Sequence, residues 1–160
     1  MIHIPRLLDD GLTLADGVQK ETINVKTDYA ASLPSVLGDP HLLTEALSNI
    51  VQNAVEATPP GGEVTIQARP VRDVQGRRFA PSPLVGEGGD GGGVQVMIKN
   101  TGSGLSEDLR ERIFEPFFST KPGGSGLGLT IARRLIESHG GRISVESDGA
   151  SWTSFVIELP

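Results

Sequence analysis

Between residues 40 and 58 the hydrophobic positions recur with the period of an α-helix, and the polar positions fall on the opposite side. Asp39 is a favourable N-cap and Pro40 a favourable first residue, while the prolines and glycines at 59–62 end the pattern. The pattern predicts an amphipathic helix. Its core face carries Leu43, Ala46, Leu47, Ile50, Ala54 and Ala57, and its polar face carries Glu45, Ser48, Asn49, Gln52, Asn53 and Glu56.

The same criterion predicts two further helices. Residues 5–15 hold leucines at roughly helical spacing. From Leu127 onward the apolar side of the second helix carries Ile131, Ala132, Leu135 and Ile136. Alternation of apolar and polar residues predicts strands at 22–29, 63–69, 94–99, 142–146 and 154–159, with a short strand at 2–4.

Residues 70–93 are rich in glycine and proline and contain few large apolar side chains. Such a composition does not repay the entropy lost on ordering, so it predicts a flexible excursion. The strands on either side belong to one sheet, so the excursion interrupts a hairpin and does not separate domains. With 160 residues, we expect a single domain spanning 1–160.

Charge and composition narrow the possible partners. Lysine and arginine number 14 against 20 for aspartate and glutamate, and a net charge of -6 argues against a nucleic acid partner. The chain has no cysteine, which excludes disulfides and thiolate metal sites. No apolar run approaches the roughly 20 residues of a membrane span. We therefore expect a soluble, cytoplasmic domain without membrane contact of its own, whether or not a larger parent protein is membrane-anchored.

One helix face carries candidate metal chemistry. Asn49 and Asn53 lie one turn apart in mid-helix, where asparagine is a mediocre helix former. Their amide oxygens suit Mg²⁺, although a solvated polar face is the simpler interpretation of the pair alone.

Two glycine-rich segments carry candidate nucleotide chemistry. Residues 123–129 (GGSGLGL) place glycines directly before a helix, which presents backbone N–H groups to phosphate, and Lys121 could neutralise a terminal phosphate. Residues 100–105 (NTGSGL) would let the backbone approach a planar base, with Asn100 bonding the base edge. Together with the asparagine pair, these segments predict a metal-nucleotide pocket.

The order of these motifs resembles the catalytic ATP-binding domain of sensor histidine kinases, within the gyrase, chaperone, histidine kinase and mismatch-repair ATPase superfamily. Residues 39–58 resemble the N box of that family and residues 100–105 its first glycine box. Residues 113–118 (IFEPFF) resemble its F box, and residues 123–129 its second glycine box. The run FFSTKPGGSGLGL is close to the form found in nitrogen-regulation-type kinases.

The resemblance implies an α+β fold of the Bergerat type: a two-layer sandwich in which a mixed, mostly antiparallel sheet packs on three main helices. ATP and Mg²⁺ would bind under a mobile lid at about 106–125, with Asn53 as metal ligand and Phe114, Phe117 and Phe118 as hydrophobic latches. The nucleotide-binding residues that the resemblance implies are Asn49, Asn53, Asn100, Gly102, Gly104, Thr120, Lys121, Gly124, Ser125, Gly126, Leu127 and Gly128.

A catalytic carboxylate is less clearly marked. Glu45 lies on the same helix face as Asn49, so these two residues are the candidates for orienting a water or an attacking nucleophile. A surface glutamate is an equally good interpretation of Glu45.

The resemblance implies transfer of the γ-phosphoryl group of ATP to a histidine on a separate dimerisation domain, with a response regulator downstream. Only His3, His41 and His139 are present, and none lies in a recognisable acceptor motif. We therefore expect the acceptor elsewhere in a parent chain or in trans.

Two alternatives stay open at this stage. One is a stand-alone serine kinase of the anti-sigma type. The other is a degenerate, non-catalytic nucleotide-binding module, which is favoured by Asn100 because the family normally carries aspartate there. Glu56 is a further departure, because many relatives carry a basic residue at that position.

Overall fold

A computed structural model of the chain describes residues 1–15, 22–71 and 92–160. In chain order the elements are α1 (Ile4–Ala15), β1 (Asn24–Tyr29), α2 (Pro40–Ala57), β2 (Glu63–Val71), β3 (Gly93–Thr101), α3 (Glu107–Arg112), α4 (Gly128–Ser138), β4 (Arg142–Ser147) and β5 (Trp152–Leu159). None of the described helices is both long and apolar enough to cross a membrane.

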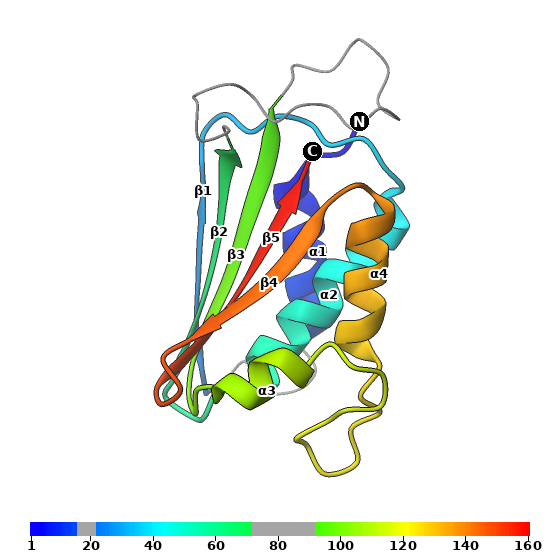
Figure 1. The fold of residues 1–160 in the computed structure, drawn as a ribbon. Helices are drawn as coiled ribbons and strands as arrows, with labels where there is room; N and C mark the ends of the chain where they lie inside the picture. Colours follow the sequence, from blue (N-terminus) through cyan, green and yellow to red (C-terminus); the bar gives the residue numbers. More distant parts are fainter. Residues whose placement is uncertain (16–21, 72–91) are drawn as a thin grey trace.

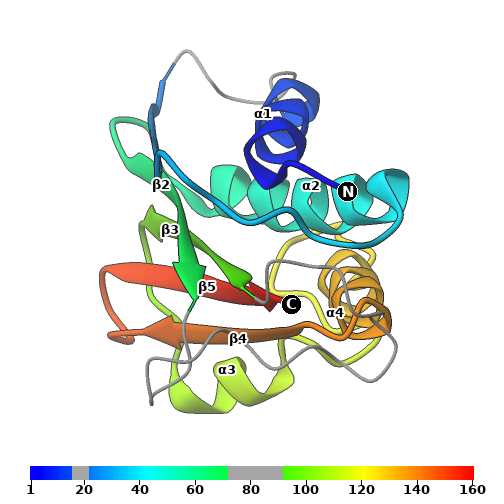
Figure 2. The ribbon, with the colours of Figure 1, turned by 90° about the horizontal axis from the view of Figure 1, so that it is seen from above.

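The strands form a five-stranded sheet in the order β1-β2-β3-β5-β4. β1 pairs with β2 in parallel, and the other neighbours pair antiparallel. Helices α1, α2 and α4 cover one face of the sheet, and the short α3 lies at one end (Figures 1 and 2). The expected two-layer α+β fold, with a mixed and mostly antiparallel sheet on three main helices, is confirmed.

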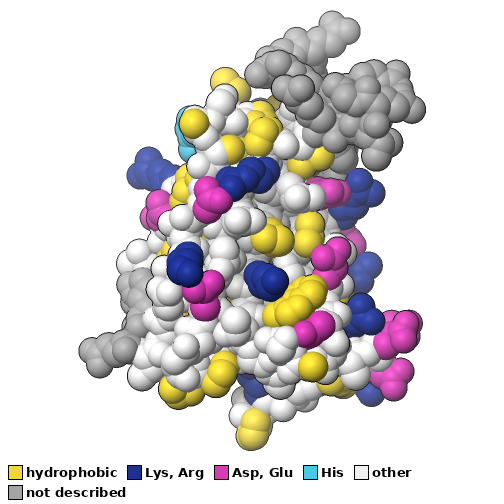
Figure 3. All heavy atoms as spheres, turned by 90° about the vertical axis from the view of Figure 1, so that its left-hand side faces the viewer, with side chains coloured by type: hydrophobic (Ala, Val, Ile, Leu, Met, Phe, Trp, Pro, Cys, Tyr) yellow, Lys and Arg dark blue, Asp and Glu magenta, His cyan; other side chains and the backbone are white. Residues whose placement is uncertain are grey.

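One hydrophobic core lies between the sheet and these helices. It receives alternate residues of each central strand, such as Val64 and Ile66 of β2 and Val96 and Ile98 of β3, all fully buried. The opposite face of the sheet carries basic and acidic side chains beside one another (Figure 3), including the ion pairs Lys26–Glu63 and Arg142–Glu158, both 2.6 Å. Within the described residues the sheet is therefore covered by helices on one side only, which explains the alternation of its sequence.

The start of α2 follows the expectation from sequence. The Asp39 carboxylate accepts hydrogen bonds from the backbone N–H of His41 (2.8 Å) and of Leu42 (3.2 Å). The ring of His139, after the end of α4, is fixed at the same place, because its Nε2 accepts from the backbone N–H of Asp39 at 3.1 Å. The beginning of α2 and the end of α4 are thereby tied together.

Some sequence predictions of local structure are wrong. Residues 2–4 do not form a strand: Ile2 makes a single bridge with Val36, and α1 already begins at Ile4, whose side chain is buried in the core. Two side chains placed on core faces, Ala57 and Ile131, are exposed. The short α3 was not predicted.

The hairpin of β2 and β3 is longer than the sequence predicted. Pro70 pairs with Val94 and Val71 with Gly93, so these residues of the expected excursion belong to strands. The parallel partner β1 ends at Tyr29, which pairs with Ala68, so no β1 residue lies beside Pro70 and needs its missing N–H. The rest of the expected flexible segment, residues 72–91, lies outside the described residues.

Candidate nucleotide-binding site

A cavity of about 420 Å³ lies between α2, the end of β3 and the segment that joins α3 to α4. It brings together segments that are far apart in the sequence. The lining residues are Asn49, Gln52, Asn53, Glu56, Ala57, Asn100, Ser103, Leu105, Ile113, Phe118, Ser119, Thr120, Lys121, Gly124, Ser125, Gly126, Gly128, Leu129, Thr153 and Phe155.

One wall of the cavity is the polar face of α2. Asn49 and Asn53 are half-buried there, and a Cβ added to Gly128 would lie 3.7 Å from Asn49 Oδ1. Neither side-chain amide has a hydrogen-bond partner within the described ranges. The two predicted asparagines therefore face the cavity with their polar atoms free for a ligand.

The donor set of this wall fits a hard divalent cation. Amide oxygens are ligands that Mg²⁺ accepts, and this ion commonly takes only one or two protein ligands when phosphate oxygens complete its shell. Within the described part of the chain, no three His, Cys, Asp or Glu side chains gather in a cluster that could hold a metal alone. The site therefore fits a metal that arrives with a phosphate ligand.

A second wall is the end of β3. Asn100 is only 2% exposed, and its Nδ2 donates to the carbonyl oxygen of Thr101 at 3.1 Å. In the register of the sheet Asn100 lies opposite Thr153 of β5, which is also buried and also lines the cavity. One N–H of the Asn100 amide is thus engaged, and its oxygen, which accepts no hydrogen bond from the described residues, stays available as an acceptor.

Gly102 and Gly104, predicted to bind nucleotide, do not line the cavity. A Cβ on Gly102 would meet the carbonyl oxygen of Ala57 at 2.7 Å, and one on Gly104 would meet the backbone nitrogen of Ala150 at 2.4 Å. These glycines let the turn after β3 pass close to the end of α2 and to the turn between β4 and β5. Their contact with nucleotide stays a prediction.

The segment expected to form the lid begins with α3, and two of its three aromatic side chains, Phe114 and Phe118, pack against the hydrophobic core. Phe114 packs edge-on against Phe155 with ring centroids 6.4 Å apart, and Arg112 lies over the ring of Phe118 at 4.4 Å. Phe117 is 78% exposed and has a positive φ of 63°.

The loop closes on itself where Phe117 meets Gly126. The Phe117 N–H donates to the Gly126 carbonyl at 3.1 Å, and a Cβ on Gly126 would meet the Phe117 carbonyl carbon at 2.4 Å. Any larger residue at 126 would therefore force the loop apart.

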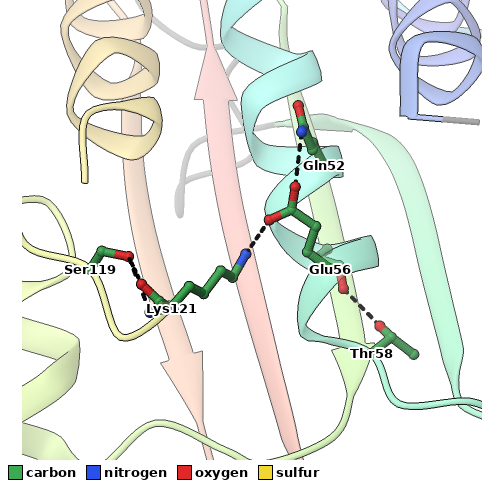
Figure 4. A network of polar contacts seen from close by, with 6 residues as sticks. Gln52, Glu56, Thr58, Ser119 and Lys121 are labelled. Atoms are coloured by element: carbon green, nitrogen blue, oxygen red, sulfur yellow. Dashed lines mark hydrogen bonds and ion pairs between the residues drawn. The ribbon is translucent and has the colours of Figure 1, made fainter. Parts of the chain in front are cut away.

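A charged pair crosses the cavity. Lys121 Nζ lies 2.6 Å from Glu56 Oε2, and Gln52 Nε2 donates to Glu56 Oε1 at 2.8 Å (Figure 4). Burial alone would raise the pKa of Glu56, but the hydrogen bonds from Lys121 and Gln52 and the positive charge of Lys121 outweigh it. The pKa of Glu56 therefore lies below its ordinary value, and the group is a carboxylate at neutral pH.

The α4 helix opens on the same cavity. Gly128 is its first residue, and the N-cap Leu127 makes no side-chain capping hydrogen bond. By contrast, α2 is capped by Asp39 and α3 by Ser106. The first N–H groups of α4 therefore lack a side-chain acceptor, and such groups bind anions.

The remaining predicted residues divide between cavity and surface. Thr120, Gly124 and Ser125 line the cavity, whereas Leu127 and Glu45 do not, and Glu45 is exposed. Sequence reasoning assigned no site role to Gln52 and Phe155, and it noted Glu56 only as a departure from the family. For Gln52 and Glu56 a signal was present, because both fall on the polar helix face of Asn49 and Asn53.

Residues 38–160 match the sequence profile of the histidine kinase-, DNA gyrase B- and HSP90-like ATPase family, and the chain belongs to that family. It is a catalytic ATP-binding domain of the sensor histidine kinase type, as the motif resemblance implied.

The relatives include nitrogen-regulation kinases. The sensory histidine kinase/phosphatase NtrB of Rhodobacter capsulatus is 40% identical over 137 residues, which cover 83% of this chain but 36% of that protein. The chain thus spans about a third of the length of this relative.

Solved structures agree with this placement. The catalytic domain of the histidine kinase ThkA has a TM-score of 0.76 at 29% identity, covering 99% of this chain and 93% of that one. ThkA was also solved in complex with the response regulator protein TrrA, where the TM-score is 0.72 at 28% identity, covering 99% of this chain and 40% of the ThkA chain.

Proposed function

We propose that this domain binds ATP together with Mg²⁺ and transfers the γ-phosphoryl group to a histidine of a separate dimerisation domain. In this reaction the bond between the γ-phosphorus and its bridging oxygen breaks, a phosphorus–nitrogen bond to the imidazole forms, and ADP leaves. The observation that carries the proposal is the side-chain-uncapped start of α4, which opens on the same cavity as the free amides of Asn49 and Asn53.

The parts of the cavity take complementary roles in this proposal. Asn100 Oδ1 would accept a hydrogen bond from the adenine amino group, and the phosphates would lie at residues 124–128 and the start of α4. Bound Mg²⁺ would neutralise charge on the phosphate oxygens, with Asn53 as its ligand and Asn49 beside the phosphates. Glu45, exposed one turn before Asn49, is the candidate carboxylate for orienting the incoming imidazole.

The partners follow from the same proposal. A histidine-bearing dimerisation domain would supply the acceptor, in a parent chain or in trans, and a response regulator would receive the phosphoryl group next. The ThkA–TrrA complex is consistent with this order for a related kinase. We place the reaction in the cytoplasm, where ATP is available.

Calorimetric titration with ATP, ADP and GTP, each with and without Mg²⁺, tests the binding part. We expect ATP to bind in a metal-dependent manner and more tightly than GTP. The absence of ATP binding in the presence of Mg²⁺ would overturn the proposal.

Incubation with ATP labelled at the γ-phosphate tests the transfer. A separately purified dimerisation domain from a nitrogen-regulation-type relative serves as acceptor, and the same domain with its histidine changed to glutamine serves as control. We expect acid-labile label on the acceptor alone. Binding without transfer would favour the non-catalytic nucleotide-binding module, the alternative that Asn100 in place of aspartate suggests. Label on a serine would favour the serine kinase of the anti-sigma type.

A further inference from the structure

The cavity has a nearly neutral charge in this structure because its two charged groups are paired with each other. Among the described residues that line it, Lys121 is the only cation and Glu56 the only anion. Their side chains are 34% and 30% exposed, so solvent screens the pair only in part. An incoming triphosphate therefore finds no free positive side chain among the described residues of the cavity wall.

Both partners of the ion pair are held in place by further contacts. Gln52 donates to the second oxygen of Glu56, so both carboxylate oxygens are engaged. On the other side, the Ser119 hydroxyl accepts from the backbone N–H of Lys121 at 3.1 Å (Figure 4). The ion pair thus bridges the α2 helix and the lid segment.

Phosphate that binds Lys121 either displaces Glu56 or shares the ammonium group with it, because that group has three N–H donors. In either case the Glu56 carboxylate loses part of its neutralisation and stays on the cavity wall beside the bound phosphate. Like charges a few ångströms apart at a partly buried site repel measurably. A divalent cation neutralises part of the phosphate charge and so lowers this repulsion, whereas metal-free nucleotide meets it in full.

We propose that Glu56 is a selectivity residue, which makes the cavity choose metal-complexed nucleotide over free nucleotide. This inference rests on the proposed nucleotide function and deepens it. The neighbouring Asn49, Gln52 and Asn53 are neutral, so they do not distinguish the two forms of the nucleotide by charge repulsion.

The variant Glu56→Gln tests the inference, because it keeps the side-chain size and removes the charge. The dissociation constant of ATP is measured at constant ionic strength, once with Mg²⁺ and once with a chelator. We expect the variant to bind metal-free ATP at least about fivefold more tightly than the parent, and Mg²⁺-complexed ATP within about twofold of the parent. The preference for the metal complex therefore shrinks.

Glu63→Gln is the matched control. Glu63 also forms a 2.6 Å ion pair, with Lys26, and its side chain is 34% exposed, but it lies on β2 outside the cavity. The control loses the same net charge, and we expect it to keep the metal preference of the parent. Thermal unfolding of both variants checks that they are folded, and Glu56→Ala provides a second variant with the same expected direction.

The outcomes separate this inference from the function on which it rests. Equal tightening of both ATP forms by Glu56→Gln, or equal effects of the two glutamine variants, would overturn the selectivity role and leave the nucleotide function intact. Failure of the parent to bind ATP in either condition would overturn both.

Discussion

Asn100 is the residue whose chemistry differs most clearly from the expected adenine contact. Its amide makes an ordinary hydrogen bond to an adenine amino group, whereas a carboxylate makes a charge-assisted one about twice as strong. We expect Asn100→Asp to tighten ATP by ~1 kcal/mol, or about fivefold, and to sharpen the preference for adenine over guanine. Calorimetry with ATP and GTP in the presence of Mg²⁺ measures both effects.

The same substitution should weaken the empty domain. Asn100 is buried and donates to the Thr101 carbonyl, and an aspartate cannot make that bond. A lower unfolding temperature without nucleotide should therefore accompany the tighter binding. Tighter ATP binding by the asparagine form than by the aspartate form would contradict the placement of Asn100 at the adenine edge.

Tyr29 offers a test of local electrostatics, because it is the only tyrosine in the chain. Burial, the negative charge of Asp9 and the hydrogen bond from the Tyr29 hydroxyl to Asp9 raise the pKa of Tyr29 above its ordinary value of 10. The pKa of the folded state thus exceeds that of the unfolded state. The stability that Tyr29 contributes is complete below pH 10 and is lost as the pH rises toward the folded-state pKa.

Absorbance of tyrosinate during an alkaline titration measures this shift directly. We expect the native midpoint to lie above the midpoint in denaturant, and Asp9→Asn to bring the two closer together. Coincident midpoints for the native and denatured parent would show that the contact with Asp9 is not formed.

At the scale of elements, sequence patterns predicted the long amphipathic segments well. The α2 helix was foreseen from its cap to its end, because Asp39, the apolar period and Pro59 all agree. The six residues of α3 bury no side chain, so they leave no hydrophobic period to detect. Ile131 was misplaced because a period identifies a helix face but not how far the neighbouring layer extends to cover it.

The candidate site was predictable only in part for a related reason. The polar arc of α2 and the glycines before α4 are visible as patterns in sequence. The Glu56–Lys121 pair joins residues 65 positions apart, and no local pattern predicts which lid residue reaches which turn of α2. The close approach of Gly102 to the end of α2 is likewise set by tertiary packing, so no local sequence pattern predicts it.

A substitution on the polar face of α2 allows an effect on nucleotide binding to be separated from an effect on folding stability. Asn53 faces the cavity and has no hydrogen-bond partner in the described residues, and alanine is the better helix former. We expect Asn53→Ala to abolish metal-dependent ATP binding and to keep or raise the unfolding temperature. Calorimetry and thermal unfolding of the same sample measure both, and unchanged metal-dependent binding would refute the assignment of Asn53 as metal ligand.

The hairpin of β2 and β3 predicts that residues 72–91 are dispensable. Val71 and Gly93 are still paired, so a short turn can connect the strands without disturbing their register. We expect this replacement to keep ATP affinity and to stabilise the domain modestly, since loop closure costs about 0.6 kcal/mol per doubling of length. Urea unfolding and ATP titration measure the result, and loss of either folding or binding would place these residues in the core or the site.

On the scale of the whole molecule, we expect the sheet and the site to respond to ligand as one cooperative unit, because one hydrophobic core joins the sheet to the helices. A ligand that binds only the folded state stabilises it by about 2.7 kcal/mol at a concentration 100 times its dissociation constant. We expect ATP with Mg²⁺ to raise the unfolding temperature of the parent and to have little effect on Asn53→Ala. A similar rise in both would mean that the nucleotide binds elsewhere.

The strand order has a consequence for hydrogen exchange. Because β3 and β4 both pair with β5, the lid segment and α4, which lie between β3 and β4 in the chain, form one excursion whose two ends are fixed by paired strands. Amide protons of β3 and β5 should then exchange only when the whole domain unfolds, whereas those of the lid should exchange through local opening. Nucleotide should slow the exchange of the lid amides strongly. The strand amides should slow only as far as global stability rises, so exchange measured along the chain would separate closure of the lid from tightening of the fold.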